Sequence, residues 1–425
     1  MNQLLPTTKA QVSGHKFLLR RAEHGVEFGD IRMIHDPLGR RRRSLALGGV
    51  AVILTALGAG ALAVFHPAAD PGDAPIVVAD SGAHYVRVGE QLHPVANLAS
   101  ARLITGGGEA PARASDGIIA GMPRGVPLGI LDAPGVLAEA TPQDAQWSVC
   151  HHPNGQVVVA HGSTPAKLGE REAVLARTDE GDFAVTAHGR ARLPDAQTPE
   201  GRAIRRRLGI RPDTGAWEPP NDVLAALTEL PPWQPPAGPL EIFTASDGSA
   251  WLVRYSGITR LSATQRDVLL DLGAKSTPVA PAALADHADA APEPIGLPES
   301  PYEWLDSSGG EGTEPFGDIA RAAVCVVDGG GARAQPEDQA PDSGVALSGD
   351  SVATRFVSAG VGGVGVDTGH GFGVVADTGR RHAVADRGAL AALGVTEPQP
   401  APWGVLRLLP QGSPLTRDEA LAATY

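Results

Sequence analysis

The chain of 425 residues is long enough for two or three ordinary domains. Aromatic residues make up only 4% of it, whereas glycine occurs 53 times and proline 37 times, which favours short strands and many turns over a helical bundle. The net charge of −13 is unevenly spread, because residues 1–43 carry a net +5 and the chain beyond residue 65 carries −18. This acidic part argues against nucleic acid or anionic lipid as its partner.

The N-terminal segment has the pattern of a basic amphipathic helix. Residues 8–28 are predicted to be helical, with a start at Thr7 or Thr8. The predicted apolar stripe consists of Phe17, Leu18, Ala22 and Val26, and the basic residues Lys16, Arg20 and Arg21 lie elsewhere on the surface. Such a helix can lie on a membrane surface or dock on a partner, and a solvated basic tail is a further interpretation that the spacing leaves open.

A membrane-spanning helix is predicted next, from Ser44 to Phe65. This stretch holds 22 uncharged residues, about 33 Å as a helix, close to the thickness of a bilayer's hydrocarbon core. The basic residues directly before it, Arg40, Arg41, Arg42 and Arg43, place that end in the cytoplasm by the positive-inside rule. A cleaved signal peptide is the alternative, since Ala61-Leu62-Ala63 resembles a cleavage site, but its charged N-terminal region would be unusually long. We therefore expect 1–43 to be cytoplasmic, 44–65 to span the membrane and 66–425 to lie beyond it.

Beyond the span, one pattern of short segments occurs four times, at about residues 76–106, 174–210, 240–273 and 356–395. In each copy a turn with Asp or Gly precedes a short apolar strand, and a second turn, a second strand and a short helix follow. Turns such as Asp247-Gly248 supply the positive φ of tight hairpins, and endings such as Leu208-Gly209 are typical of helix C-caps. Chance similarity in a Gly-rich chain is the alternative. The stretches 276–320 and 328–347, rich in Gly, Ala, Pro and acids, are predicted to be loops.

A ββα unit cannot bury its own apolar face, so the four copies should pack on a shared core, which the segments around Cys150 and Cys325 could form. The predicted fold class is α+β, mainly β.

Both cysteines follow the span, so they would face an oxidising compartment. Two cysteines allow one intramolecular pair, which would close a loop of about 175 residues, and two free buried thiols are the alternative.

No catalytic, cofactor or metal site is predicted. The dipeptide Gly-Lys does not occur, so the sequence has no Walker A motif. Gly360-x-Gly362-x-x-Gly365 precedes a turn and a strand, whereas a dinucleotide fingerprint needs a helix there. Histidines are scattered without an HExxH motif, although a spatial Ser/His/Asp group stays open because triads are not sequential.

Several of these segments together carry a family resemblance. The most specific are Thr8 to Gly25 (TKAQVSGHKFLLRRAEHG) and Arg32 to Leu38 on the cytoplasmic side. Tyr85 to Ile104, Trp147 to Cys150 and Leu408 to Leu415 belong to the same pattern. They resemble EccB, a core membrane subunit of the actinobacterial type VII (ESX) secretion system. The resemblance covers nearly the whole chain and is poor at 276–347.

The resemblance implies a protein of the cell inner membrane with a cytoplasmic N-terminal helix, one span and a periplasmic domain. In that domain four repeat modules surround a central β core, and a disulfide joins Cys150 to Cys325. It also implies assembly with EccC-, EccD- and EccE-like subunits, self-association through the periplasmic domain and contact with membrane lipid. Phe17, Arg20 and Arg21 are our candidates for docking on the cytoplasmic partners.

We therefore expect a structural subunit of the secretion complex. A nucleotide hydrolase is one alternative, because the family is sometimes labelled an ATPase, although the missing Walker A motif does not support it. A module that binds the cell envelope is the other. Trp251, Tyr255 and Phe372 could line its groove, although we favour a place for them in the core.

Overall fold

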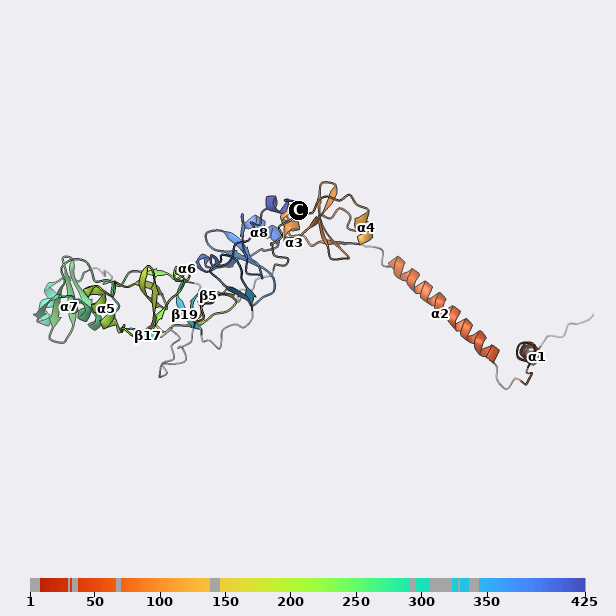
Figure 1. Ribbon diagram of the computed structural model, residues 1–425, viewed down its shortest axis with the longest axis horizontal. Helices are drawn as coiled ribbons and strands as arrows, with labels where there is room; N and C mark the ends of the chain where they lie inside the picture. Colours follow the sequence, from red (N-terminus) through yellow and green to blue (C-terminus); the bar gives the residue numbers. More distant parts are fainter. Residues whose placement is uncertain are drawn as a thin grey trace, which may run out of the picture. The chain divides into compact units, whose positions relative to one another are not determined.

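The computed structural model divides into two units, residues 1–70 and 71–425. Figure 1 shows the helices and strands of each. The structure describes residues 8–29, 31–32, 37–65, 70–137, 146–290, 295–305, 323–327, 329–335 and 344–424.

The described residues of the first unit form two helices. Helix α1 runs from Lys9 to Phe28. Thr8 caps its start in a capping box with Gln11, and Gly29 ends it at a φ of 66°. Helix α2 (Pro37–Phe65) begins before the predicted span, so the basic cluster belongs to the same helix. Its Arg40–Ala61 stretch, with a mean hydropathy of 1.9, is the one stretch among the described residues that is long and apolar enough to cross a membrane.

The second unit is mixed α and β with more strand than helix, and four of its sheets share one strand order. Three antiparallel strands come first, a helix follows, and a fourth strand pairs in parallel with the first. The first sheet has β1 (Ile76–Ala79), β2 (His84–Val88), β3 (Gln91–Val95), α3 (Leu98–Thr105) and β4 (Ala112–Ala114). The second has β8 (Glu172–Thr178), β9 (Gly181–Thr186), β10 (Gly189–Arg192), α5 (Pro199–Leu208) and β11 (Ala216–Trp217).

The other two sheets repeat this order. The third has β13 (Glu241–Ala245), β14 (Ala250–Arg254), β15 (Gly257–Leu261), α7 (Ala263–Asp271) and β16 (Lys275–Val279). The fourth has β22 (Val364–Asp367), β23 (Phe372–Val375), β24 (Arg381–Val384), α8 (Arg387–Leu393) and β25 (Gln399–Pro400). The predicted ββα pattern therefore missed the first and last strand of each sheet. Those strands are two to seven residues long, too short to show a periodicity of their own.

Each sheet is completed in the same way. A short helix follows the fourth strand: α4 (Asp116–Ala120), α6 (Asn221–Leu224), the 3₁₀ helix η2 (Pro281–Asp286) or α9 (Trp403–Leu406). The chain then pairs in parallel with the third strand, through Arg124, β12 (Glu229–Leu230), Asp289 or Gln411. A further strand, β17 (Glu303–Leu305), pairs with β8. Part of the predicted loop 276–320 is thus regular structure.

A seven-stranded sheet is built from segments far apart in sequence, in the order β20-β21-β6-β5-β18-β19-β7. Its strands are β5 (Trp147–His151), β6 (Val157–His161), β7 (Ala166–Lys167), β18 (Ala323–Val327), β19 (Ala332–Gln335), β20 (Val345–Ala346) and β21 (Arg355–Ser358). Trp147, Val149 and Val326 on one of its faces are at most 1% exposed. They belong to a core that also includes Val174 of β8, Val366 of β22 and Val405 of α9. This core joins the seven-stranded sheet to the second and fourth sheets.

The helices connect the four smaller sheets in pairs. Helix α3 packs on α8, and apolar side chains of the first and fourth sheets form one core. Helix α5 packs on α7, and apolar side chains of the second and third sheets form another core. The C-terminal helix α10 (Arg417–Ala420) also packs on α3.

Candidate functional site

The predicted docking residues lie in the middle of α1. Phe17, Arg20 and Arg21 are all exposed, and Phe17 is 53% exposed. Residues three and four apart are neighbours on a helix, so Phe17 adjoins both arginines. The predicted apolar stripe is wrong in one member, because Phe17 and Val26 are nine residues, or about 180°, apart and point to opposite sides. Phe17 therefore belongs to a different face from Leu18, Ala22 and Val26.

The basic cluster lies at the start of α2. Arg40, Arg41, Arg42 and Arg43 are exposed and precede the uncharged stretch directly. Nη2 of Arg42 lies 3.0 Å from Oε2 of Glu23 on α1. Both side chains are well exposed, so this ion pair adds little stability; it marks the point at which the two helices approach each other.

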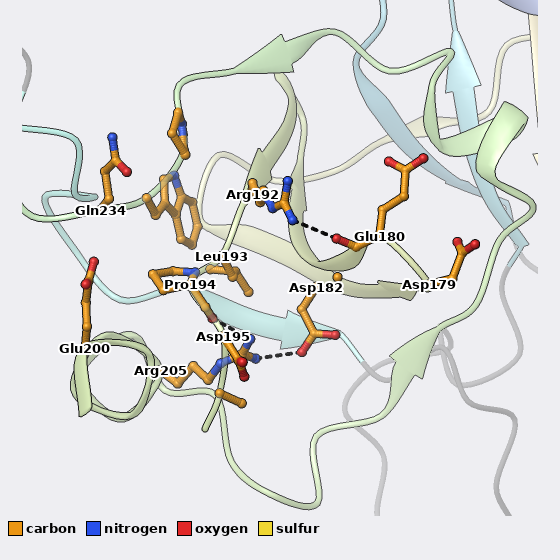
Figure 2. Close-up of a pocket in the computed structure, with 14 residues that line it drawn as sticks. Asp179, Glu180, Asp182, Arg192, Leu193, Pro194, Asp195, Glu200, Arg205 and Gln234 are labelled. Atoms are coloured by element: carbon orange, nitrogen blue, oxygen red, sulfur yellow. Dashed lines mark hydrogen bonds and ion pairs between the residues drawn. The ribbon is translucent and has the colours of Figure 1, made fainter. Parts of the chain in front are cut away.

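A cavity of about 470 Å³ opens on the second sheet and was not anticipated from the sequence. Figure 2 shows Arg205 of α5 directed at Asp182, with Nη1 and Oδ2 2.9 Å apart. Arg192 donates a hydrogen bond to the backbone oxygen of Glu180 at 2.9 Å. The lining includes five carboxylates and two guanidinium groups, namely Asp179, Glu180, Asp182, Asp195, Glu200, Arg192 and Arg205. Its net negative charge does not suit a nucleotide's phosphates.

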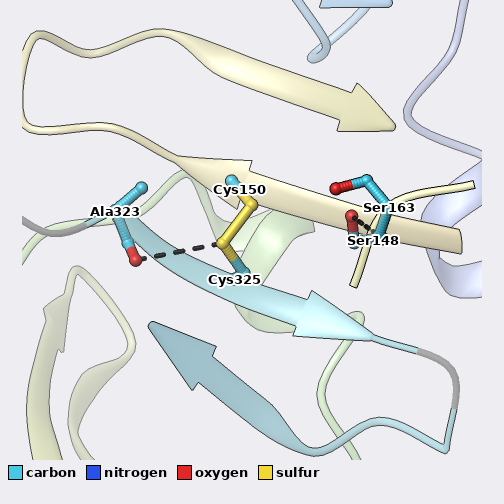
Figure 3. Close-up of a disulfide and its surroundings, with 5 residues drawn as sticks. All are labelled: Ser148, Cys150, Ser163, Ala323 and Cys325. Atoms are coloured by element: carbon cyan, nitrogen blue, oxygen red, sulfur yellow. Dashed lines mark hydrogen bonds between the residues drawn. A yellow bond between two sulfur atoms is a disulfide. The ribbon is translucent and has the colours of Figure 1, made fainter. Parts of the chain in front are cut away.

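The two cysteines form a disulfide between β5 and β18, as the resemblance implied (Figure 3). Cys150 and Cys325 are directly opposite each other in the antiparallel register, with Sγ atoms 2.08 Å apart. Their side chains are buried, with exposed fractions of 3% and 0%. The bond joins two strands of the seven-stranded sheet that lie 175 residues apart in sequence.

A histidine beside this disulfide contacts the second sheet. Nε1 of Trp217 on β11 donates a hydrogen bond of 3.0 Å to Nδ1 of His151 on β5. Because an indole N–H can only donate, Nδ1 of His151 must be unprotonated. Burial, and then the neighbouring His152, lower the pKa of His151 below its ordinary value of 6.5. The sequence gives no sign of this contact, because 66 residues separate its partners.

Among the residues that the structure describes, no group of three or more His, Cys, Asp or Glu side chains is arranged to hold a metal ion. The glycines of the Gly360-x-Gly362-x-x-Gly365 match lead into β22 and not into a helix. This is not the strand–turn–helix context that a dinucleotide site needs.

Comparison with known proteins identifies the family. Residues 4–246 and 240–424 match the family described as "Type VII secretion system ESX-1, transport TM domain B", EccB. The chain belongs to the EccB family. Its relatives include the "ESX-3 secretion system ATPase EccB3" of Mycolicibacterium smegmatis, with 32% identity over 98% of this chain and 90% of the relative. The "ESX-5 secretion system ATPase EccB5" of Mycobacterium tuberculosis is 30% identical over 98% of this chain and 93% of the relative.

Solved EccB structures have the same fold. A chain of an intact ESX-5 inner membrane complex superposes with a TM-score of 0.66 and 27% identity, covering 100% of this chain and 97% of that one. A chain of the periplasmic assembly from that complex has a TM-score of 0.66 and 28% identity, over 85% of this chain and 96% of that one. A chain of the EccB3 dimer from the ESX-3 core complex, with 24% identity and a TM-score of 0.65, covers 82% of this chain and is itself covered in full.

Proposed function

We propose that this EccB protein is a structural membrane subunit of a type VII (ESX) protein secretion complex. The observation that carries the proposal is its similarity, along the whole chain, to a subunit of the intact ESX-5 inner membrane complex. The described part of the large second unit offers five sheets for contacts with other subunits, and α2 offers a membrane anchor. These parts suit a scaffold that holds a complex together at the membrane.

Residues 1–43 lie in the cytoplasm in this proposal, 44–65 span the inner membrane, and 66–425 form the periplasmic domain. Two observations support that orientation. The basic cluster Arg40–Arg43 precedes the uncharged part of α2. The disulfide lies in the second unit, and disulfides persist in oxidising compartments.

The periplasmic domain is proposed to consist of four copies of one module around the seven-stranded core. The shared strand order of the four smaller sheets supports this, as does the short helix and parallel segment that complete each of them. The two pairs of packed helices, α3 with α8 and α5 with α7, would hold neighbouring modules together. We further propose that this domain self-associates, since the second unit resembles a chain of the ESX-5 periplasmic assembly.

On the cytoplasmic side, Phe17, Arg20 and Arg21 are proposed to dock on EccC-, EccD- or EccE-like subunits. An exposed aromatic ring beside two arginines is a combination that is enriched in the energetic centres of interfaces. The names of the mycobacterial relatives include the word ATPase, which we do not carry over to this chain. This chain's sequence lacks a Walker A motif, and the cavity around Arg205 is lined by more carboxylates than guanidinium groups.

Native extraction tests the proposal. The full chain with a C-terminal tag is extracted from its host membrane in mild detergent, and the purified material is analysed by native gel and mass spectrometry. We expect a species far larger than a dimer of this 43.7 kDa chain, containing an FtsK-like ATPase and multi-span membrane proteins. A lone monomer or dimer would overturn the proposal. ATP turnover that depends on this chain's own residues would favour the hydrolase.

A further inference from the structure

Helix α1 has a second apolar face, distinct from the one that carries Phe17. Val12, Leu19 and Val26 are seven residues apart, and residues at this spacing drift by only about 20° per step around a helix. All three point to solvent, with exposed fractions of 42%, 52% and 90%. They form a continuous apolar row along nearly the whole helix.

A charged row runs directly beside this apolar row. Lys16 is four residues after Val12 and three before Leu19, so it adjoins both, and Lys9 adjoins Val12. Glu23 is the next residue at the same seven-residue spacing, but its carboxylate lies 3.0 Å from the guanidinium of Arg42. With Glu23 paired, the row presents a net positive charge.

Near the C-terminal end of α1, part of the opposite side is covered by the chain's own side chains. His24, seven residues after Phe17, is only 4% exposed, and its ring centroid lies 5.6 Å from that of Phe28. The side chain of Ile31 lies against Gly25. The row of Val12, Leu19 and Val26 lies away from these contacts and is open to solvent, as are Phe17 and Leu18 elsewhere around the helix.

The position of α1 along the chain keeps this open face near the membrane. Phe28 ends α1 and Pro37 begins α2, so the connection between them spans at most about 30 Å even when fully extended. In the structure, Glu23 of α1 lies beside Arg42 at the basic end of α2, where the uncharged stretch begins.

We propose that α1 lies along an anionic lipid surface. Val12, Leu19 and Val26 enter the boundary between headgroups and acyl chains, and Lys9 and Lys16 contact lipid phosphates. Charge complementarity favours this occupant over a protein, because cationic side chains adjoin an apolar row whose tether already holds it at a bilayer. The inference goes beyond the proposed function, since the docking of partners was assigned to Phe17, Arg20 and Arg21.

The test uses the full chain in lipid nanodiscs of phosphatidylcholine, with or without phosphatidylglycerol. A single cysteine is introduced by Leu19→Cys or, as the matched control on the other side, by Phe17→Cys. It is labelled with an environment-sensitive fluorophore, and Cys150 and Cys325 do not react because they are joined in a buried disulfide. Quenching by spin-labelled lipid reports contact with the bilayer.

In discs with phosphatidylglycerol, we expect the emission of the fluorophore at position 19 to shift to the blue and to be quenched by spin-labelled lipid. Neither effect is expected at position 19 without phosphatidylglycerol, or at position 17 in either lipid. In the Leu19→Cys background, Lys9→Glu with Lys16→Glu should abolish both signals, whereas Lys9→Arg with Lys16→Arg should keep them.

Three results would overturn the proposal: solvent exposure at position 19 in both lipids, equal protection in both lipids, or protection only after partner subunits are added. The last result would assign the face to a protein. None of them bears on membership of the complex, which native extraction tests separately.

Discussion

Two arginines show how single side chains hold neighbouring sheets together. Nη1 of Arg102 on α3 donates a 2.7 Å hydrogen bond to the backbone oxygen of Leu393, at the end of α8. Nε of Arg417 donates a 3.1 Å hydrogen bond to the oxygen of Ile104, at the end of α3. The last carbonyls of a helix lack partners within the helix and carry partial negative charge, so an arginine from a neighbour stabilises both helix ends.

Replacement of Arg102 by alanine should destabilise the second unit. The change removes a charge-assisted hydrogen bond and leaves the Leu393 carbonyl without this donor, a loss of about 1.5–3 kcal/mol of unfolding free energy. Denaturant unfolding of the full chain measures it. Arg113→Ala is the matched control, because Arg113 is exposed and should change stability little. Equal stability of the two variants would contradict this role for Arg102.

His151 should make the stability of the fold depend on pH. Its pKa in the folded chain lies below 6.5, so below about pH 6.5 the unfolded chain binds a proton that the folded chain does not. The contribution of this histidine is therefore complete above that pH and is lost as the pH falls towards its folded pKa. Denaturant unfolding at a series of pH values measures the effect.

The variant His151→Gln keeps a hydrogen-bond acceptor for Trp217 but does not titrate, so its stability should fall less on acidification than that of the natural chain. His370→Gln, at an exposed turn, is the control and should leave the pH dependence unchanged. If His151→Gln and the natural chain lose the same stability on acidification, His151 is not responsible.

At the scale of elements, α1 is proposed to use two faces for two purposes. Replacing Arg20 and Arg21 by glutamate reverses two charges beside Phe17, and we expect the subunit to dissociate from its complex. Co-purification of the partner subunits with the tagged chain is the measurement. The control variant carries Lys9→Glu with Lys16→Glu, which is an equal charge change on the neighbouring row. This variant should keep the partners bound. Unchanged co-purification of the Arg20/Arg21 variant would refute docking through this face.

The repeated β-β-β-α-β order depends only partly on local sequence. The turns and helix ends of the pattern follow from local chemistry, since Gly209 and Gly394 end their helices at φ values of 85° and 97°, as the Leu-Gly pattern predicted. The position of the fourth strand does not follow from local chemistry, because strands such as β11 and β25 are only two residues long. Their place is set by pairing with a strand far back in the chain.

For the whole molecule, the disulfide bears on both the orientation of the chain in the membrane and the stability of the second unit. In the proposed topology the second unit folds in an oxidising compartment, so a thiol reagent should add mass to the chain from intact cells only after reduction and denaturation. Free thiols before reduction would argue against a periplasmic location. Mass spectrometry of the alkylated chain distinguishes the two outcomes.

Removal of the disulfide should also destabilise the second unit. Cys150→Ser with Cys325→Ser opens a loop of 175 residues, which in the chain-entropy model costs about 5 kcal/mol of unfolding free energy. Denaturant unfolding of the variant measures the loss, and the reduced natural chain should behave like the variant. A variant as stable as the oxidised natural chain would show that the pairing of β5 with β18 suffices without the bond.

By itself, the sequence determined the features that depend on neighbouring residues. The uncharged stretch of α2, the basic cluster before it, the cap at Thr8 and the tight turns all follow from residues within one helix or hairpin. The motifs at Thr8–Gly25 and Tyr85–Ile104 also identified the EccB family, which the comparisons confirmed. The pairing of Cys150 with Cys325 was implied by that resemblance.

Only the tertiary structure decided which parts meet. The order of the seven-stranded sheet, the packing of α3 on α8, the contact of Trp217 with His151 and the cavity around Arg205 all join segments that are far apart in sequence. Short strands and single polar contacts carry no periodicity, so local pattern cannot reveal their partners. Such contacts form because burying apolar faces outweighs the entropy of closing long loops, and that balance is set by the whole chain.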